Sequence, residues 1–395
     1  MKIAQDIALW IFWISFGIIV YAYLLYPIVL FLIYAFVQMR RDVVYLLGRR
    51  DRRAARPSEE NLPSVSLVVA AHNEETHLAE KLANIRTLDY PRDKFEVIFV
   101  SDGSTDRTSE ILQSAAVGEI RCIFLEKRGG KARALNYAVA EARHDILVFS
   151  DASTLFEPDA LRKLVRHFSD ARVGGVCGSV KFQSSKESQQ TEGVYWKFEG
   201  VLRLMEARLG ATLTASGAIY ALRRVAYRSL DRDAVLDDFV VPMNSRRAGY
   251  CIQYDPEAIA IEFAPETIAG EFKRRVRLAT GSFAVLADFL RIPLNGITVF
   301  AFFSHKICRW FVPFFLVALL ASNMLLLHGA YRVFLAVQIL FYLWAGLGFV
   351  FHGRMKRVPY ALLGYFLLAM NLAFLVGFFR FVAGNRDVTW ERVDS

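Results

Sequence analysis

The chain has 395 residues, 54% of them hydrophobic, and a formal net charge of +9 at pH 7. The hydrophobic share exceeds the ~45–50% of an ordinary soluble domain, and the surplus lies at the two ends of the chain. The positive charge predicts an acidic partner. Because seven arginines fall between residues 40 and 56, directly after the first apolar segment, a membrane surface is favoured and a nucleic-acid-binding protein is disfavoured.

The first predicted element is a transmembrane helix within residues 1–40. Residues 7–38 are almost uninterrupted apolar and aromatic side chains, which exceeds the ~20 residues needed to cross a bilayer. A signal peptide is disfavoured because this stretch is too long and arginines follow it. Residues 41–61 are then a basic juxtamembrane linker, which predicts that the next domain faces the cytoplasm. The four cysteines show no disulfide-framework or metal-ligand spacing, as expected of a reduced cytosolic domain.

From Val65 onward, short β-branched runs alternate with helical stretches. Four runs have the pattern of buried strands: Val65–Ala70, Phe95–Ser101, Ile120–Leu125 and Asp145–Ser150. The helical stretches between them are 75–87, 107–116 and 132–142. This alternation predicts βαβ units and a parallel sheet. In such sheets ligands bind beyond the carboxyl ends of the strands, so the polar residues that follow each strand are candidates for a site.

Two of these strand-end segments could contact a nucleotide. Asp102 follows the second strand and could accept hydrogen bonds from a base or a ribose, whereas Thr105 or Asp106 could simply cap the next helix. The segment Lys127–Lys131 contains two glycines whose amides can approach a phosphate, and Lys131 adds a cation near a helix N-terminus. A glycine turn with solvated cations is the alternative for this segment.

Two further acidic segments could take part in chemistry. Asp151 follows the fourth strand, and a carboxylate there can hold Mg²⁺ or Mn²⁺ through oxygen; Ser153 could instead cap a helix. Asp237 and Asp238 open an apolar-periodic helix over 239–248. This pair could supply a general base that removes a proton from a hydroxyl, or it could cap the helix and complement its dipole.

A basic helical stretch, Phe272–Arg277, precedes the C-terminal apolar region. Arg274 or Arg277 could neutralise a leaving diphosphate, because arginine binds phosphate in a bidentate manner. Contact with lipid headgroups is the alternative.

The C-terminal part is predicted to lie first on and then in the membrane. Residues 283–304 are apolar but carry Asp288, Arg291 and Pro293, which favours an amphipathic helix at the interface; a buried helix of the soluble domain is the alternative. Transmembrane helices are predicted at 310–327, 333–351 and 359–379. Three simple spans would place the last arginines outside, against the positive-inside rule, so the topology of the last segment stays open.

Taken together and in this order, the motifs resemble the family 2 glycosyltransferases of the GT-A fold. The similar branch is membrane-embedded and includes cellulose, hyaluronan and poly-N-acetylglucosamine synthases. The resemblance covers roughly residues 62–281 and implies a cytoplasmic α/β domain with a mixed, mostly parallel sheet. After this domain we expect three further segments of the chain: interfacial amphipathic helices over 282–309, transmembrane helices over 310–384 and a tail over 385–395.

The resemblance also implies roles for individual residues. Asp238 matches the catalytic base, and Asp151 matches the first aspartate of the metal-binding Asp-x-Asp motif, in which Ser153 replaces the second. Gly217 and Asp237 fall on the acceptor side. The residues that match the donor pocket are Ala71, Asn73, Glu74, Asp102, Lys131, Arg274 and Arg277. Two positions of the family's Gln-x-x-Arg-Trp motif differ, since Arg274 and Leu278 stand where the family has glutamine and tryptophan.

The implied activity is inverting transfer of a sugar from a nucleotide diphosphate donor, expected to be a UDP-sugar, with Mg²⁺ or Mn²⁺ as cofactor. The expected acceptor is a membrane-proximal glycan in cell-surface polysaccharide synthesis at a bacterial inner or plasma membrane. Two alternatives remain: a non-processive transferase that adds one sugar to a membrane lipid, and an inactive scaffold that keeps the fold. Membrane lipids, an oligomer or an export protein are expected partners, and nucleic acid is not.

Overall fold

The computed structural model describes residues 2–48, 62–183, 189–231, 236–263, 268–290, 296–355, 358 and 360–384. The predicted basic linker from residue 49 onward and the predicted tail 385–395 lie outside these residues, as do Arg291 and Pro293.

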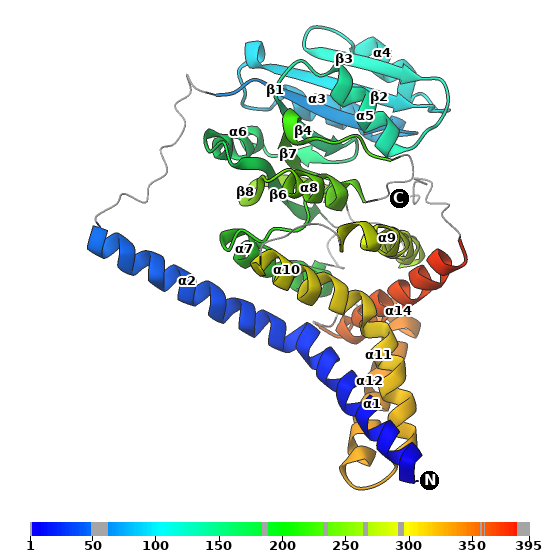
Figure 1. Ribbon diagram of the computed structural model, residues 1–395. Coiled ribbons are helices and arrows are strands. Elements are labelled where there is room, and N and C mark those ends of the chain that lie inside the picture. The colour runs from blue at the N-terminus through cyan, green and yellow to red at the C-terminus, as the bar shows by residue number, and fades with distance from the viewer. Residues whose placement is uncertain are drawn as a thin grey trace.

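A single mixed sheet of eight strands organises the middle of the chain, within the part that the structure describes (Figure 1). Its strands are β1 Val65–Ala71, β2 Phe95–Asp102, β3 Ile120–Leu125, β4 Ile146–Asp151, β5 Leu155–Phe156, β6 Val173–Gln183, β7 Tyr220–Arg223 and β8 Cys251–Phe263. Their order across the sheet is β3-β2-β1-β4-β7-β6-β8-β5. All four strands that the sequence predicts are present, and their ends differ from the prediction by one residue at most.

The register of the parallel half brings three strand ends to one edge. Strand β1 runs parallel to β2 and β4, and β2 runs parallel to β3. Ala71 pairs with Ser101 of β2, and Ala70 pairs with Asp151 of β4. On the other side of β4, strand β7 is antiparallel to β4 and β6, β6 is parallel to β8, and β5 is antiparallel to β8. The carboxyl ends of β1, β2 and β4 therefore lie side by side.

Helices cover both faces of this sheet. They are α3 Glu75–Arg86, α4 Thr108–Ala115, α5 Lys131–Glu141, α6 Ala160–Val165, α7 Gln189–Arg208 and α8 Asp237–Arg247, with short 3₁₀ turns at Arg92–Lys94, Arg166–Ser169 and Arg224–Ala226. A further helix, α9 Ile268–Phe289, packs on the C-terminal helix Leu363–Val382. Because side chains alternate along a strand, Val69 packs on one face in a cluster with Leu78 of α3, and Val68 packs on the other in a cluster with Leu135 of α5. The continuous apolar runs of β1 and β2 follow from burial on both faces.

Four helices of the described residues are long and apolar enough to cross a membrane. The bounds of the helical segments at the two ends are α1 Lys2–Val20, the π-helix η1 Tyr21–Leu25, α2 Tyr26–Gly48, α10 Gly296–Ala301, the π-helix η6 Phe302–Ile307, α11 Cys308–Leu325, α12 Ala330–Val350, α13 His352–Met355 and α14 Leu363–Val382. Each predicted C-terminal span falls on its own helix. The first helix is longer than predicted: Ile3–Gly48 is 46 residues, or about 69 Å at 1.5 Å per residue.

This length is more than twice the ~30 Å of a bilayer core, so α1 and α2 cannot both stand upright within one membrane. Figure 1 shows α2 leaving the α1–α11 bundle at a shallower slope and running beneath the α/β domain. The change of slope coincides with the π-helix η1 and with Pro27, the second residue of α2. Both features are common causes of a bend in a helix.

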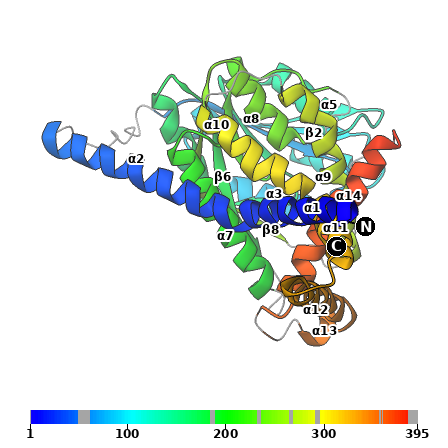
Figure 2. The same cartoon turned by 60° about the horizontal axis from the view of Figure 1, so that its bottom comes forward.

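The predicted amphipathic range 283–304 does not form one continuous helix. The structure divides this range between α9, which ends at Phe289, and a second helix that begins at Gly296 and continues into α11. Phe283 and Phe289 are both buried, and they join a cluster with Trp310. Figure 2 shows α9 and α10 on the side of the α/β domain where α8 lies. One side of α9 is therefore buried and the other, with Asp288, is exposed, and a position at the membrane interface stays a prediction.

Candidate active site

The turns after β1 and β2 are tied to each other. Asn73 adopts a left-handed backbone with φ of 54°, a conformation that asparagine tolerates better than most residues. The Asn73 Oδ1 accepts a hydrogen bond of 2.8 Å from the Thr105 amide, and the Glu74 amide donates one of 2.8 Å to Thr108 Oγ1. Together with the buried Ala71 at the end of β1, these predicted donor residues form one rigid corner of the sheet edge.

Asp106 serves this corner and not the open site. Its carboxylate accepts hydrogen bonds from the Thr108 amide at 2.9 Å and the Glu75 amide at 3.2 Å. Burial favours the neutral acid, but these hydrogen bonds outweigh burial and lower the pKa of Asp106 overall. Its position at the start of α4 fits the capping alternative.

Asp102 is fully buried and binds the glycine loop. Its carboxylate accepts hydrogen bonds from the Gly129 amide at 2.9 Å and the Gly130 amide at 2.6 Å. Gly103 lets the loop come this close: its φ is 60°, and a Cβ there would lie 2.5 Å from the Arg128 nitrogen. The two glycine amides that the sequence assigns to a phosphate thus donate their hydrogen bonds to Asp102. That these two motifs bind each other was not predicted.

Lys131, the first residue of α5, joins two acidic segments that lie far apart in the chain. Its Nζ lies 2.8 Å from Asp151 Oδ1 and 3.1 Å from Asp237 Oδ2. Burial alone would lower the pKa of this ammonium group, but the two carboxylates raise it overall. Lys131 therefore stays charged at neutral pH.

Gly217 forms one wall of the same site. A Cβ placed on it would lie 3.3 Å from Lys131 Nζ, 3.7 Å from Asp151 Oδ2 and 4.0 Å from the Asp238 Cβ. The glycine thus leaves free the space on which the ammonium and two carboxylate side chains converge. Larger side chains at this position would fill it.

Asp238 follows Asp237 at the start of α8, and its carbonyl oxygen accepts a hydrogen bond of 2.7 Å from the Ala215 amide. Burial, and then the charge of Asp237, raise the pKa of Asp238 to about 6, while Lys131 opposes the shift. A carboxyl group with a pKa this close to neutrality is suited to accept a proton from a hydroxyl.

Lys81 supports the site from behind and was missed by the sequence analysis. The Lys81 side chain is 1% exposed, and its Nζ donates a hydrogen bond of 2.7 Å to Ser150 Oγ and a second, short one to the Thr154 carbonyl oxygen. Burial lowers the pKa of Lys81 to about 7 against the opposing charge of Asp151. The signal in the sequence was its place one helical turn after Leu78, on the apolar face of α3.

The arginines of α9 point in different directions. Arg274 Nη1 lies 3.6 Å from Glu262 Oε1 of β8. Arg275 lies over the Phe366 ring of α14, with 4.9 Å between the guanidinium carbon and the ring centroid. Arg277 is half-buried about one turn further along α9 than Arg274. For these two donor candidates, Arg274 and Arg277, contact with a diphosphate stays a prediction.

The residues present fit a hard divalent cation. Among the described residues, no group of three or more His, Cys, Asp or Glu side chains is arranged to hold a metal. Mg²⁺, however, is usually bound through one or two carboxylates together with substrate phosphates and water. Three carboxylates, those of Asp151, Asp237 and Asp238, gather around the ammonium of Lys131, and Ser153 is half-buried two residues beyond Asp151. The excess of negative charge favours a cation.

Sequence comparison agrees with this architecture. Residues 66–230 match the family described as Glycosyl transferase family 2. Two relatives are named poly-beta-1,6-N-acetyl-D-glucosamine synthase: one from Staphylococcus aureus is 28% identical over 253 residues, and one from Staphylococcus epidermidis is 29% identical over 234. The matches cover 62% and 58% of this chain and 60% and 56% of the relatives, so the chain spans about three-fifths of their length.

A solved structure extends the likeness to almost the whole chain. It is a mannosyltransferase from Pyrobaculum calidifontis in complex with GDP-Man and Mn²⁺, 25% identical, with a TM-score of 0.67 over 94% of this chain and 99% of that one. This likeness and the mixed eight-stranded sheet give the present chain the GT-A-like fold of a glycosyltransferase. More particularly, residues 66–230 match the family 2 glycosyltransferases, and long apolar helices lie on both sides of this domain, which confirms the predicted resemblance and fold.

Proposed function

We propose that the enzyme transfers a sugar, with inversion, from a UDP-sugar to a hydroxyl group of an acceptor at the membrane surface, in the synthesis of a cell-surface polysaccharide. The convergence of Lys131, Asp151, Asp237 and Asp238 at the carboxyl edge of the sheet carries this proposal. The names of the staphylococcal relatives support a polysaccharide product.

In this proposal Asp238 acts as the general base. It takes the proton from the acceptor hydroxyl, and that oxygen attacks the anomeric carbon on the face opposite the leaving nucleotide. The raised pKa of Asp238 makes it a stronger base than an ordinary aspartate, while it is still ionised at neutral pH. Asp237 contributes by keeping negative charge beside it.

Lys131 and the carboxylate of Asp151 act on the donor side. Asp151, with help from Ser153, would hold Mg²⁺ or Mn²⁺, which supplies Lewis-acid neutralisation of the donor diphosphate. Lys131 lies within 3.1 Å of both Asp151 and Asp237, so its ammonium group is placed to stabilise the charge on the departing nucleoside diphosphate. The buried Lys81 holds the strand end from which Asp151 projects.

The acceptor is proposed to reach Asp238 from the membrane side. Phe239, the neighbour of Asp238, has its ring centroid 6.1 Å from that of Phe302 and 6.2 Å from that of Trp310, on the helix 296–325. The base therefore lies on a helix that packs directly on a candidate membrane span. We place the protein in a bacterial inner or plasma membrane with the catalytic domain on the cytoplasmic side, because Arg40 and Arg41 follow the apolar residues 7–38 of the first helix.

A single transfer to a membrane lipid is the second candidate. Arg274 replaces the glutamine of a motif that holds a growing polymer in the similar synthases, and its guanidinium is paired with Glu262. The solved relative that matches almost the full length of the chain is a mannosyltransferase. The product separates the two candidates, because a glycosylated lipid is extracted by organic solvent and a polymer is not.

The test uses membranes that contain the full-length protein, labelled UDP-sugars and Mn²⁺. Asp238→Asn should reduce transfer by about 10²–10⁴-fold, because asparagine cannot accept the proton, while donor binding stays close to that of the wild type. Asp93→Asn is the matched control, since Asp93 is an exposed carboxylate on a short turn before β2, and it should leave transfer unchanged. Wild-type turnover in Asp238→Asn would remove Asp238 as the base.

A further inference from the structure

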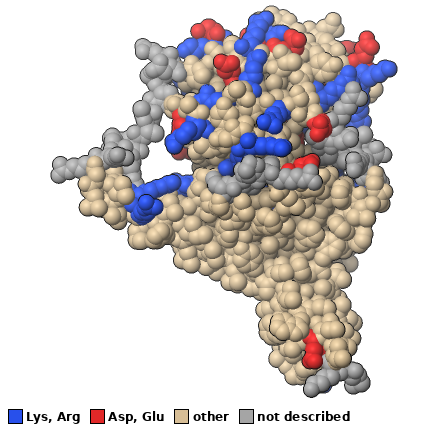
Figure 3. Space-filling view, in the orientation of Figure 1, with Lys and Arg blue, Asp and Glu red and all other residues tan. Residues whose placement is uncertain are grey.

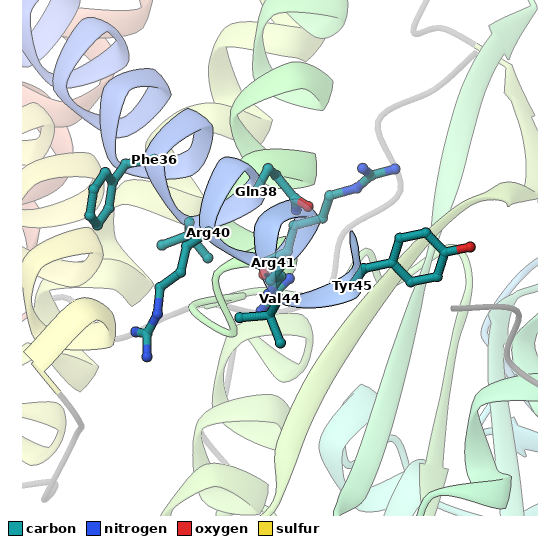
Figure 4. Close-up of a pocket in the computed structure, with 8 residues that line it drawn as sticks. Phe36, Gln38, Arg40, Arg41, Val44 and Tyr45 are labelled. Atoms are coloured by element: carbon teal, nitrogen blue, oxygen red, sulfur yellow. Dashed lines mark hydrogen bonds between the residues drawn. The ribbon is translucent and has the colours of Figure 1, made fainter. Parts of the chain in front are cut away.

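A groove with a cavity volume of about 790 Å³ lies between the end of α2 and the end of α7. Its charged lining consists of Arg40 and Arg41 of α2 and Arg208, the last residue of α7. Apolar side chains of α2, among them Phe36 and Val44, line the rest. Figure 4 shows Phe36, Arg40, Arg41 and Val44 along the last turns of α2. Two segments that are far apart in the sequence thus build one basic and apolar surface.

Two of the three arginines of the groove, Arg41 and Arg208, hydrogen-bond to uncharged oxygens. Arg41 Nη1 lies 3.3 Å from the carbonyl oxygen of Arg208, and Arg208 Nη1 lies 3.2 Å from the hydroxyl of Tyr34. None of the eight described side chains that line the groove is a carboxylate. Three like charges therefore share one groove whose lining supplies no counter-charge, and an anion bound there would relieve their repulsion.

The apolar part of the lining distinguishes a lipid from a free anion. Phe36 is 61% exposed and Val44 is 52% exposed. Both lie in the apolar helix Ile3–Gly48, which is longer than a membrane span requires. The groove lies at the end of this helix, where apolar residues give way to arginines. Figure 3 shows the change along the molecule, from a lower part almost without charged side chains to the charged α/β domain. Such a boundary is where phospholipid headgroups lie.

We propose that this groove is a binding site for one anionic phospholipid. The phosphate lies among Arg40, Arg41 and Arg208, because guanidinium groups bind phosphate oxygens in a bidentate manner. The acyl chains lie along Phe36 and Val44. A lipid bound in this way bridges α2 and α7 and so fixes the first membrane helix against the glycosyltransferase domain. The site is separate from the sugar-transfer site and does not depend on the donor or acceptor.

The test is titration of the detergent-solubilised full-length protein with phosphatidylglycerol and phosphatidylcholine of the same acyl chains, with bound lipid counted by native mass spectrometry. Phosphatidylglycerol should bind more tightly than phosphatidylcholine. Arg40→Gln/Arg41→Gln should weaken phosphatidylglycerol binding by about fivefold per arginine, which is the effect of one basic residue at an anionic surface. Arg208→Gln should do the same.

Two controls distinguish a phospholipid site from a general effect of surface charge and from a free-anion site. Arg107→Gln removes an exposed arginine of the α4 N-cap and should leave lipid binding unchanged. Phe36→Ser should weaken phosphatidylglycerol binding, and inorganic phosphate should fail to displace the lipid at matched concentration. Thermal unfolding of each variant checks the fold. If Arg208→Gln is unstable, the exposed Arg40 and Arg41 still carry the test.

Three results would overturn the proposal. Equal binding of phosphatidylcholine would leave only an apolar surface. Displacement by inorganic phosphate at matched concentration would indicate a free-anion site. Unchanged phosphatidylglycerol binding in the folded Arg40→Gln/Arg41→Gln variant would place the lipid elsewhere.

Discussion

Asp238 and Lys131 carry opposite charges and lie at the same site. The pKa of each is raised, but the causes differ. Burial and Asp237 raise the pKa of Asp238 to about 6, while two carboxylates raise the pKa of Lys131. Around neutral pH the first is an ionised base and the second a cation, which are the protonation states that the proposed transfer requires.

A pH dependence of the rate follows from Asp238. A base is active when deprotonated, so the rate at limiting donor should rise with pH between about 5 and 7 and be level above that range, with a midpoint near the pKa of about 6. The measurement is the initial rate of sugar transfer at fixed Mn²⁺ across this range. A rate that is already level at pH 5, or that falls as pH rises from 5 to 7, would contradict the role of Asp238.

Individual residues also show what sequence alone does not predict. Asp102 and the glycine loop were both interpreted as ligand contacts, but the carboxylate accepts the amides of Gly129 and Gly130. Lys81 was not among the candidate residues, although it is buried and its Nζ donates a hydrogen bond to Ser150, the neighbour of Asp151. Each outcome depends on a partner 27 or 69 residues away, and such pairings leave no local pattern to detect.

At the scale of elements, α7 joins the catalytic domain to the membrane helices through a buried polar network. Glu206 is 3% exposed. It accepts a hydrogen bond of 2.6 Å from the Tyr26 hydroxyl of α2, and its Oε1 lies 2.5 Å from His305 Nδ1 of η6. The other ring nitrogen of His305 lies 3.1 Å from Glu199, which also pairs with Arg309 of α11. Buried charges of this kind are costly to leave unpaired.

Truncation of Glu206 should therefore loosen the junction. Glu206→Ala leaves the Tyr26 hydroxyl and His305 without this partner and should destabilise the folded protein by about 3–5 kcal/mol, seen as a lower midpoint of thermal unfolding in detergent. Glu110→Ala is the control, because this exposed glutamate of α4 makes only a surface ion pair and its loss should cost less than about 0.5 kcal/mol. Equal midpoints for the two variants would argue against a structural role for the network.

The elements differ in how well the sequence predicts them. Strands β1 to β4 were predicted because β-branched runs and intervening helices are local patterns. The antiparallel half was not, because β7 pairs with β4 and β6 across long stretches of intervening chain and β5 is only two residues long. The division of 283–304 depends on burial of Phe283 and Phe289 against Trp310, which local hydropathy cannot distinguish from an interfacial face.

In the whole molecule, the glycosyltransferase domain packs directly against the apolar C-terminal helices. Helix α9 packs tightly on α14: a Cβ on Gly377 would lie 2.6 Å from the Cβ of Ala279. Phe239 of α8 packs among aromatic rings of the helix 296–325. The active-site helix α8 is thus fixed relative to the membrane helices, which supports an acceptor that arrives at the membrane surface.

At this scale the sequence predicted the order of parts, because apolar length and charge are properties of composition. It did not predict that the first helix runs beneath the catalytic domain, since that path follows from the bend at η1 and from contacts with α7. Nor did it predict the basic groove, which needs Arg41 and Arg208 to lie side by side.

In the proposed enzyme Asp151 and Asp238, which are far apart in the chain, belong to one site and have different roles. Calorimetric titration of the purified protein with UDP-sugar, with and without Mn²⁺, tests it directly. Asp151→Ala should weaken the Mn²⁺-dependent binding by about tenfold or more, and Asp238→Asn should bind like the wild type yet fail to transfer. Identical Mn²⁺ titrations of Asp151→Ala and the wild type would contradict the account.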